Sequence, residues 1–176
     1  MLLHFFRSPG LSPEKTNSLL VKVQREISPH VSAILSESCF NIQADLELTQ
    51  PESRLLRWLL GESFEPDGLR DISSLTNDGT LLEVGPRMNF TTAWSTNATS
   101  VFHNCGLSKI VRIERSRRFL LNADLSPNQQ FDFLNLVHDR MTECPYTSRL
   151  TSFESGIEPE PVFEIPLIQE GRAALE

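Results

Sequence analysis

The pattern of apolar and polar positions predicts a strand followed by a helix at the start of the chain. Positions alternate weakly over residues 2–7, as they do in a short strand. Ser12 then has the character of an N-cap with Pro13 at the first helical position, and apolar residues follow at helical spacing. We therefore expect a helix over residues 13–27, which the Ser-Pro pair that follows stops.

Residues 31–48 predict more strand structure. They are β-branched in places, which favours one bent strand or two strands joined by a tight turn. Thr49-Gln50-Pro51-Glu52 has the form of a capping box, and leucines then share one face up to Gly61. A second, short amphipathic helix is therefore expected. The stretch from residue 62 to residue 79 carries Pro, Gly, Asn and Asp with little periodicity, so it predicts a surface loop.

The second half of the chain shows the same kind of order. Residues 80–84 predict a strand, and Ser95 or Thr96 is expected to cap a helix that Gly106 closes. Residues 109–121 predict one long strand or a hairpin. A Ser-Pro-Asn-Gln sequence then opens a further helix.

These elements predict an α+β fold made of two similar halves. Each half has a strand, a helix, one long or two short strands and a helix, which is the pattern of helices packed on one face of an antiparallel sheet. Residues 1–146 are expected to form the folded domain. Residues 147–176 are rich in Pro and Glu and predict a linker, whose last residues resemble the start of a helix. Because a natural domain rarely stops there, we expect the chain to be a fragment.

Composition and charge exclude several classes of protein. No apolar run approaches the about 20 residues that span a bilayer, so no membrane partner is expected. The apolar start lacks the basic region of a signal peptide, and the three cysteines are widely spaced, as in a reduced, cytoplasmic protein. The net charge of -7 argues against a general nucleic-acid binder.

One basic segment departs from this acidity. Residues 107–120 contain five basic side chains and the single acidic residue Glu114. Arg115 and Arg117 have the same parity as apolar residues on either side of them, so regular alternation points both arginines at the apolar face. A bulge or turn near Ser116 could change the register, or the arginines could reach a carboxylate or another domain. The remaining alternative is a hairpin with solvated arginines.

The sequence carries no arrangement of residues that indicates catalysis. The four histidines are scattered, and the chain lacks both the HxxxH spacing and the cysteine pairs of a zinc site. The glycine-rich phosphate-binding motifs and the GxSxG motif are absent as well. We therefore expect no catalytic, cofactor-binding or metal-binding residue in this chain.

One turn could hold an anion. A strand ends in Gly-Pro, the chain turns through Arg87 and Asn89, and a helix begins near Ser95, Thr96 and Asn97. A helix start leaves free backbone N–H groups, and here they would lie beside an arginine. Alternatively, Ser95 only caps the helix and the preceding tryptophan packs over its first turn.

The segment LLEVGPRMNFTTAWSTNATSVFHNCGLSKIVRIERSRRFLL closely resembles the signature of the N-terminal domain of large, single-chain phosphoribosylformylglycinamidine synthases, also called FGAM synthases. Three later segments fit the same family in order: HDRMTE at 138–143, TSF at 151–153 and EGRAALE at 170–176. The resemblance spans residues 81–176, and residues 1–79 fit in pattern only.

The resemblance implies a structural domain that looks like two fused PurS-type small subunits. In this family the domain packs against synthetase and glutaminase domains and helps to assemble the route for ammonia. The family converts formylglycinamide ribonucleotide, glutamine and ATP to formylglycinamidine ribonucleotide. ATP and Mg are therefore expected only in the full-length enzyme, and this chain alone is expected to be inactive. Two rivals are a free-standing PurS-like adaptor and a regulatory domain that binds a small molecule.

Overall fold

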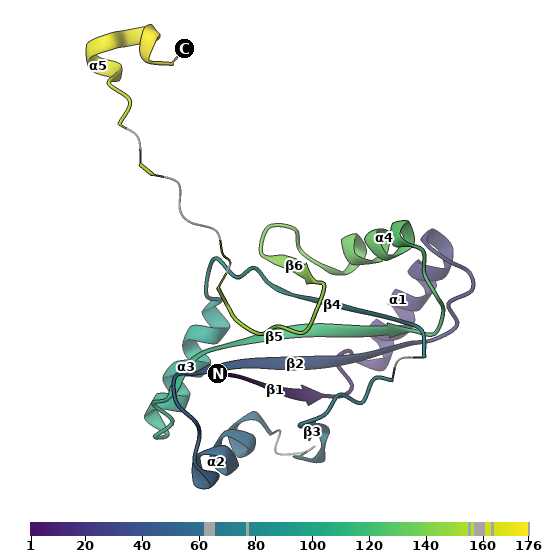
Figure 1. Cartoon of the computed structure of the whole chain (residues 1–176). Coiled ribbons are helices and arrows are strands. Elements are labelled where there is room, and N and C mark those ends of the chain that lie inside the picture. The colour runs from purple at the N-terminus through teal and green to yellow at the C-terminus, as the bar shows by residue number, and fades with distance from the viewer. Residues whose placement is uncertain (62–65, 77, 155, 157–160, 163, 176) are drawn as a thin grey trace.

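The computed structural model describes residues 1–61, 66–76, 78–154, 156, 161–162 and 164–175. Helices and strands alternate along most of the chain (Figure 1). In chain order the elements are β1 (Leu2–Arg7), α1 (Pro13–Glu26), β2 (Ile34–Ala44), α2 (Gln50–Leu60), a 3-10 turn (Pro66–Gly68), β3 (Leu69–Arg70), β4 (Thr80–Pro86), α3 (Ala93–Asn104), β5 (Ile110–Leu121), α4 (Pro127–Val137), β6 (Glu143–Tyr146), α5 (Leu167–Glu170) and a second 3-10 turn (Gly171–Leu175).

Within the described residues, six strands form one antiparallel sheet in the order β3-β1-β2-β5-β4-β6, which confirms the α+β fold. The long strands β2 and β5 pair at its centre (Figure 1). On one side of this pair lie β1 and then β3, and on the other side lie β4 and then β6. The likeness of each half to a PurS-type subunit stays a prediction.

The helix starts follow the capping signals in the sequence. The Ser12 side chain accepts a hydrogen bond from the Lys15 N–H. α2 and α4 each begin with a complete capping box, in which the side chains of the cap and of the third helical residue satisfy each other's backbone N–H groups. At the end of α3, Gly106 has a φ of +92°, a conformation that glycine adopts readily. These predicted boundaries are confirmed.

Three strand predictions need correction or completion. Residues 31–48 contain one strand, β2, and residues 109–121 also form a single strand, β5, so the hairpin alternative is wrong. The expected loop at residues 62–79 contains the short strand β3, which pairs with β1. Residues 62–65 and 77 of this loop lie outside the described residues.

In the described part of the chain, most of the buried hydrophobic residues form two clusters on the same face of the sheet. Figure 1 shows α2 and α3 at one end of the long strands and α1 and α4 at the other end. The first cluster lies under α2 and α3 and includes Phe5, Phe40, Ile42, Leu56, Leu60, Phe102 and Ile113. The second lies under α1 and α4 and includes Val23, Ile34, Val84, Phe119, Leu121 and Phe133.

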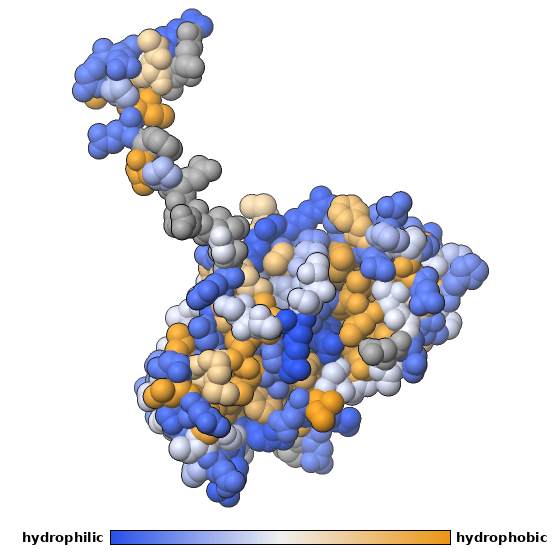
Figure 2. Space-filling model, in the orientation of Figure 1, coloured by the Kyte–Doolittle hydropathy of each residue, from blue (hydrophilic) through white to orange (hydrophobic). Residues whose placement is uncertain are grey.

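The opposite face of the sheet is polar at its centre. The side chains of Glu37, Asn41, Glu114 and Ser116 are buried there, between the strands and the segments that cover them. The chain after β6 crosses this face in front of β4 and β5 (Figure 1). We call residues 147–153 the crossing segment. Figure 2 shows a hydrophilic band between two hydrophobic areas on this side.

No helix among the described residues is long and apolar enough to cross a membrane.

Candidate functional site

The turn before α3 contains Arg87 and Asn89 of the proposed anion contact, and the first turns of α3 contain Ser95, Thr96 and Asn97. α3 begins at Ala93, and its N-cap is Thr92, so the prediction that Ser95 or Thr96 caps the helix is wrong. The Thr92 hydroxyl accepts a hydrogen bond of 3.1 Å from the Ser95 N–H. Ser95 is buried, and its own hydroxyl accepts a bond of 3.4 Å from the backbone N–H of Ile113. It therefore links the helix to β5.

A carboxylate of the chain itself lies at this helix start. The Thr92 N–H donates a hydrogen bond of 3.1 Å to Glu114 Oε1, and the Thr92 hydroxyl donates one of 2.7 Å to Oε2. Glu114 is fully buried. A negative charge is stabilised at a helix N-terminus by the helix dipole and by the free N–H groups. The Glu114 carboxylate thus lies at the helix start where we expected a bound anion. Binding of an external anion there stays a prediction.

The other residues of the proposed contact point elsewhere or lie at the surface. Arg87 donates a side-chain bond of 2.8 Å to the Arg140 carbonyl, and its N–H donates one of 3.0 Å to the Thr142 carbonyl, so it holds the turn after α4. Asn89, Thr96 and Asn97 are exposed. The Thr96 hydroxyl donates to the Thr92 carbonyl within the first turn of α3.

Arg112 connects the turn, the helix start and the crossing segment. Its guanidinium lies 3.1 to 3.2 Å from Glu114 Oε1 and donates to the carbonyls of Met88 and Phe90. It also lies over the ring of Phe153, 4.4 Å from the centroid. Only 12% of the Arg112 side chain is exposed, so the buried charge of Glu114 has a buried partner.

Arg115 and Arg117 lie on the helix-bearing face, as their parity predicted. β2 and β5 pair one to one from Ile34 opposite Leu121 to Gln43 opposite Arg112, so no bulge near Ser116 changes the register. Arg117 forms an ion pair of 2.6 Å with Glu143 and donates to the Val137 carbonyl at 3.0 Å. Its carboxylate partner thus lies within the same chain.

Arg115 has a different environment. Its guanidinium lies over the Trp94 ring, 5.7 Å from the centroid, and Arg115 is exposed. The Trp94 ring in turn lies 6.2 Å from that of Phe40, and 39% of Trp94 is exposed. Contact of either arginine with another domain stays a prediction.

On the opposite face, Arg118 lies between two glutamates. It pairs with the fully buried Glu37 and lies 3.2 Å from Glu83 Oε2. Glu37 also accepts hydrogen bonds from the hydroxyls of Ser73 and Ser74 and from the Ser74 N–H. This network ties the segment after β3 to the centre of the sheet.

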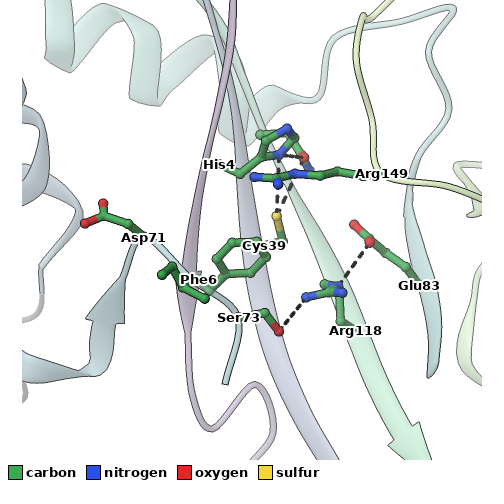
Figure 3. Close-up of a pocket in the computed structure, with 10 residues that line it drawn as sticks. His4, Phe6, Cys39, Asp71, Ser73, Glu83, Arg118 and Arg149 are labelled. Atoms are coloured by element: carbon green, nitrogen blue, oxygen red, sulfur yellow. Dashed lines mark hydrogen bonds and ion pairs between the residues drawn. The ribbon is translucent and has the colours of Figure 1, made fainter. Parts of the chain in front are cut away.

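A cavity of about 250 Å³ opens beside this network. Figure 3 shows His4, Cys39 and Arg149 at one end and Glu83, Arg118 and Ser73 at the other. His4 Nδ1 lies 2.9 Å from Asn41 Oδ1, and Arg149, from the crossing segment, lies over the ring of Phe6. The lining therefore joins β1, β2, β4, β5 and both segments that cover the open face.

The groups in this cavity do not have the properties of a reactive site. Burial raises the pKa of the Cys39 thiol to about 12, with the Glu83 carboxylate adding to the effect, so the thiolate is rare at neutral pH. Burial lowers the pKa of His4, and the nearby Arg149 lowers it further. Burial also raises the pKa of Glu83. The cavity can hold polar groups, but it lacks an activated nucleophile.

Sequence reasoning missed this polar network. Glu37 and Asn41 share one parity on β2, and they alternate with residues of the apolar face, so the period of two was a usable signal. The carboxylate partners of the arginines come from distant strands and could not be paired from the sequence. Among the residues that the structure describes, no group of three or more His, Cys, Asp or Glu side chains could hold a metal ion.

Comparison with known proteins gives consistent matches. Residues 37–153 match the family described as "Formylglycinamide ribonucleotide amidotransferase N-terminal". The chain is 42% identical, over 99% of its length, to a probable phosphoribosylformylglycinamidine synthase of Arabidopsis thaliana described as chloroplastic/mitochondrial. It is 43% identical over 98% of its length to the phosphoribosylformylglycinamidine synthase of Dictyostelium discoideum, and 35% identical over 99% to that of Homo sapiens. The chain spans 13–14% of the length of these relatives.

Proposed function

Because this chain belongs to the formylglycinamide ribonucleotide amidotransferase N-terminal family, we propose that it is the N-terminal domain of a phosphoribosylformylglycinamidine synthase and acts in purine biosynthesis. The observation that carries the proposal is the coverage of the matches. Nearly the whole chain aligns with these synthases, at 35–43% identity, but it spans only 13–14% of their length. The reaction is the glutamine- and ATP-dependent conversion of formylglycinamide ribonucleotide to formylglycinamidine ribonucleotide.

The role of this domain is structural. Its ionisable groups are used for internal cohesion, since Arg112, Arg117 and Arg118 each pair with a carboxylate of the same chain. Cys39, the most buried cysteine, has a raised pKa and is a poor nucleophile. Such a domain contributes by holding other domains in place, and its partners are the synthetase and glutaminase domains of the parent enzyme.

Correct packing of these domains keeps the ammonia route between them closed to water. The isolated chain is therefore inactive, and ATP and Mg bind elsewhere in the parent enzyme. A cytoplasmic location suits the reduced cysteines. The name of the Arabidopsis relative gives a chloroplastic/mitochondrial location for that protein.

The test uses the intact polypeptide, of the length of the relatives, that contains this chain. Residues 1–146 are removed, and synthesis is measured with glutamine and with added ammonia as nitrogen donor. Ammonia-driven synthesis should be retained and glutamine-driven synthesis should fall at least about tenfold, because only the second needs the assembled route. A second arm adds the chain of residues 1–176 in trans and should restore part of the glutamine-driven rate. A ratio of the two rates that is the same with and without the domain would refute the structural role.

A further inference from the structure

A polar row separates the two core clusters on the helix-bearing face. Arg7 on β1 lies opposite Ser38 on β2, and Ser38 lies opposite Arg117 on β5. The three side chains therefore project from the same face of three adjacent strands. Phe40 lies in the core cluster on one side of this row, and Phe119 lies in the cluster on the other. The sheet between the two helix pairs is therefore polar, with Arg115 next to the row and exposed.

A hollow lies beside Arg115. It has a volume of about 150 Å³ and is lined by Pro86, Thr92, Trp94, Glu114 and Arg115. Sites for drug-sized molecules have volumes of about 300–1,000 Å³, so this hollow is too small for a nucleotide. It is large enough for the end of one side chain.

The net charge around the hollow is positive. Glu114 is fully buried, and its carboxylate is already held by Arg112 and by Thr92. In the described residues, no carboxylate forms an ion pair with Arg115, whereas the other basic side chains of this strand and its start do have such partners: Lys109, Arg112, Arg117 and Arg118. Arg115 lies against an aromatic ring, at the surface of a chain whose net charge is -7.

We propose that this hollow is a docking site for an aspartate or glutamate side chain from a part of the intact protein outside residues 1–176. The carboxylate pairs with Arg115, and the apolar part of the same segment packs against Trp94. Arginine and tryptophan are enriched at the energetic centres of interfaces, and an arginine fork suits a carboxylate. The proposal rests on the proposed function, because it requires a longer protein that packs on this domain.

Zero-length cross-linking tests the contact. The intact protein is prepared with Arg115→Lys, which keeps the positive charge and supplies an amine. A water-soluble carbodiimide activates a carboxyl group, and a lysine amine in contact with it forms an amide while the carbodiimide takes up the lost water as a urea. Mass spectrometry of the digest then identifies the carboxylate joined to position 115.

Two matched variants control the chemistry. Arg117→Lys should cross-link to Glu143 within the chain, since the two side chains are 2.6 Å apart in the ion pair. Arg54→Lys, at an exposed position on α2, supplies an amine away from the hollow and should give at least about tenfold less of any single product. A mixture of isotope-labelled and unlabelled protein separates links within one molecule from links between copies.

The expected result is one dominant link from position 115 to an Asp or Glu outside residues 1–176 of the same molecule. The proposal is overturned if position 115 links only to carboxylates inside residues 1–176, links to a second copy, or gives no product while the Arg117→Lys control does. The proposed function is judged separately by the ratio of glutamine-driven to ammonia-driven synthesis. If removal of the domain lowers this ratio but position 115 forms no cross-link, the contact lies elsewhere and the proposed function still holds.

Discussion

The Thr92 hydroxyl donates a hydrogen bond of 2.7 Å to the buried carboxylate of Glu114. The same hydroxyl accepts from the Ser95 N–H, so one side chain caps α3 and also anchors its start to β5. The negative charge at the helix start is therefore part of the fold. It explains why the start of α3 has the features of an anion site in the sequence.

We predict that Glu114→Gln lowers the free energy of unfolding by about 3 kcal/mol. The substitution leaves the Arg112 guanidinium, which is 12% exposed, without its carboxylate, and breaking a buried pair by removing one partner costs about 3–5 kcal/mol. Urea unfolding followed by circular dichroism measures the change. Glu47→Gln at an exposed position should stay within about 0.5 kcal/mol of the unsubstituted chain. Equal effects of the two substitutions would show that Glu114 is not a buried, paired charge.

Much of the fold could be predicted because its signals are local. Capping boxes at Thr49 and Ser126 and the glycine at 106 fixed helix boundaries within the segments themselves. The start of α3 could not be fixed in this way, because several Ser, Thr and Asn residues in a row can all cap a helix. Glu114, distant in sequence, selects Thr92 among them. Strand β3 has two residues and therefore no period to detect.

The candidate site was predictable only in part, for a related reason. Parity on β5 correctly assigned Arg115 and Arg117 to the apolar face. The partner of Arg117 is Glu143 on β6, which has only four residues, one of them a proline. Such a short segment has no strand pattern that would place this carboxylate beside β5. The buried polar network needs the pairing of β2 with β5, which is a long-range property.

We predict that Gly79→Ala destabilises the fold far more than Gly106→Ala. Both glycines have positive φ, +137° and +92°, so both alanines incur backbone strain of about 1–3 kcal/mol. At Gly79 the added Cβ would also lie 2.1 Å from the Leu121 carbonyl oxygen, whereas at Gly106 it meets no atom within 4 Å. Gly79→Ala should therefore cost more than about 3 kcal/mol in urea unfolding. Similar midpoints for the two variants would contradict this close approach.

We predict that Glu83→Gln changes the pH dependence of stability in a definite direction. Burial raises the pKa of Glu83 above its ordinary value of 4.5, and Glu37 adds to the effect while Ser116 and Arg118 oppose it. The folded chain then binds this proton more tightly than the unfolded chain, so the contribution of Glu83 falls as the pH rises through the window above 4.5. Relative to the unsubstituted chain, Glu83→Gln should gain stability across that window.

Glu52→Gln serves as the comparison, because the pKa of Glu52 is shifted in the opposite direction from that of Glu83. Hydrogen bonds from Lys109 and Thr49 lower the pKa of Glu52 to about 2, so its contribution is present above pH 4.5 and is lost as the pH falls towards about 2. Glu52→Gln should therefore lose stability at neutral pH and converge with the unsubstituted chain in acid. Parallel stability curves for both variants and the parent would show that neither shift exists in solution.

We predict that the three thiols react with iodoacetamide in the order Cys105, Cys144, Cys39. Cys105 is exposed, burial raises the pKa of Cys144, and burial raises that of Cys39 to about 12. Because the thiolate is the nucleophile, Cys39 should react only when the chain unfolds. Mass spectrometry of timed samples gives the order, and urea should abolish the differences. Fast labelling of Cys39 in the folded chain would mean that the cavity around it opens readily.

The last prediction concerns where the folded domain ends. The sequence placed the boundary at residue 146, but contacts continue beyond it: Arg149 lies over Phe6, and Phe153 is buried with Arg112 over its ring. A protease needs an exposed, locally unfolded segment, so trypsin should cleave first after Arg172 and only slowly after Arg149. Phe153→Ala removes the buried ring and should speed cleavage after Arg149 at least about tenfold. Met141→Ala, at an exposed position, should leave that rate unchanged. First cleavage after Arg149 in the unsubstituted chain would instead support the boundary at residue 146.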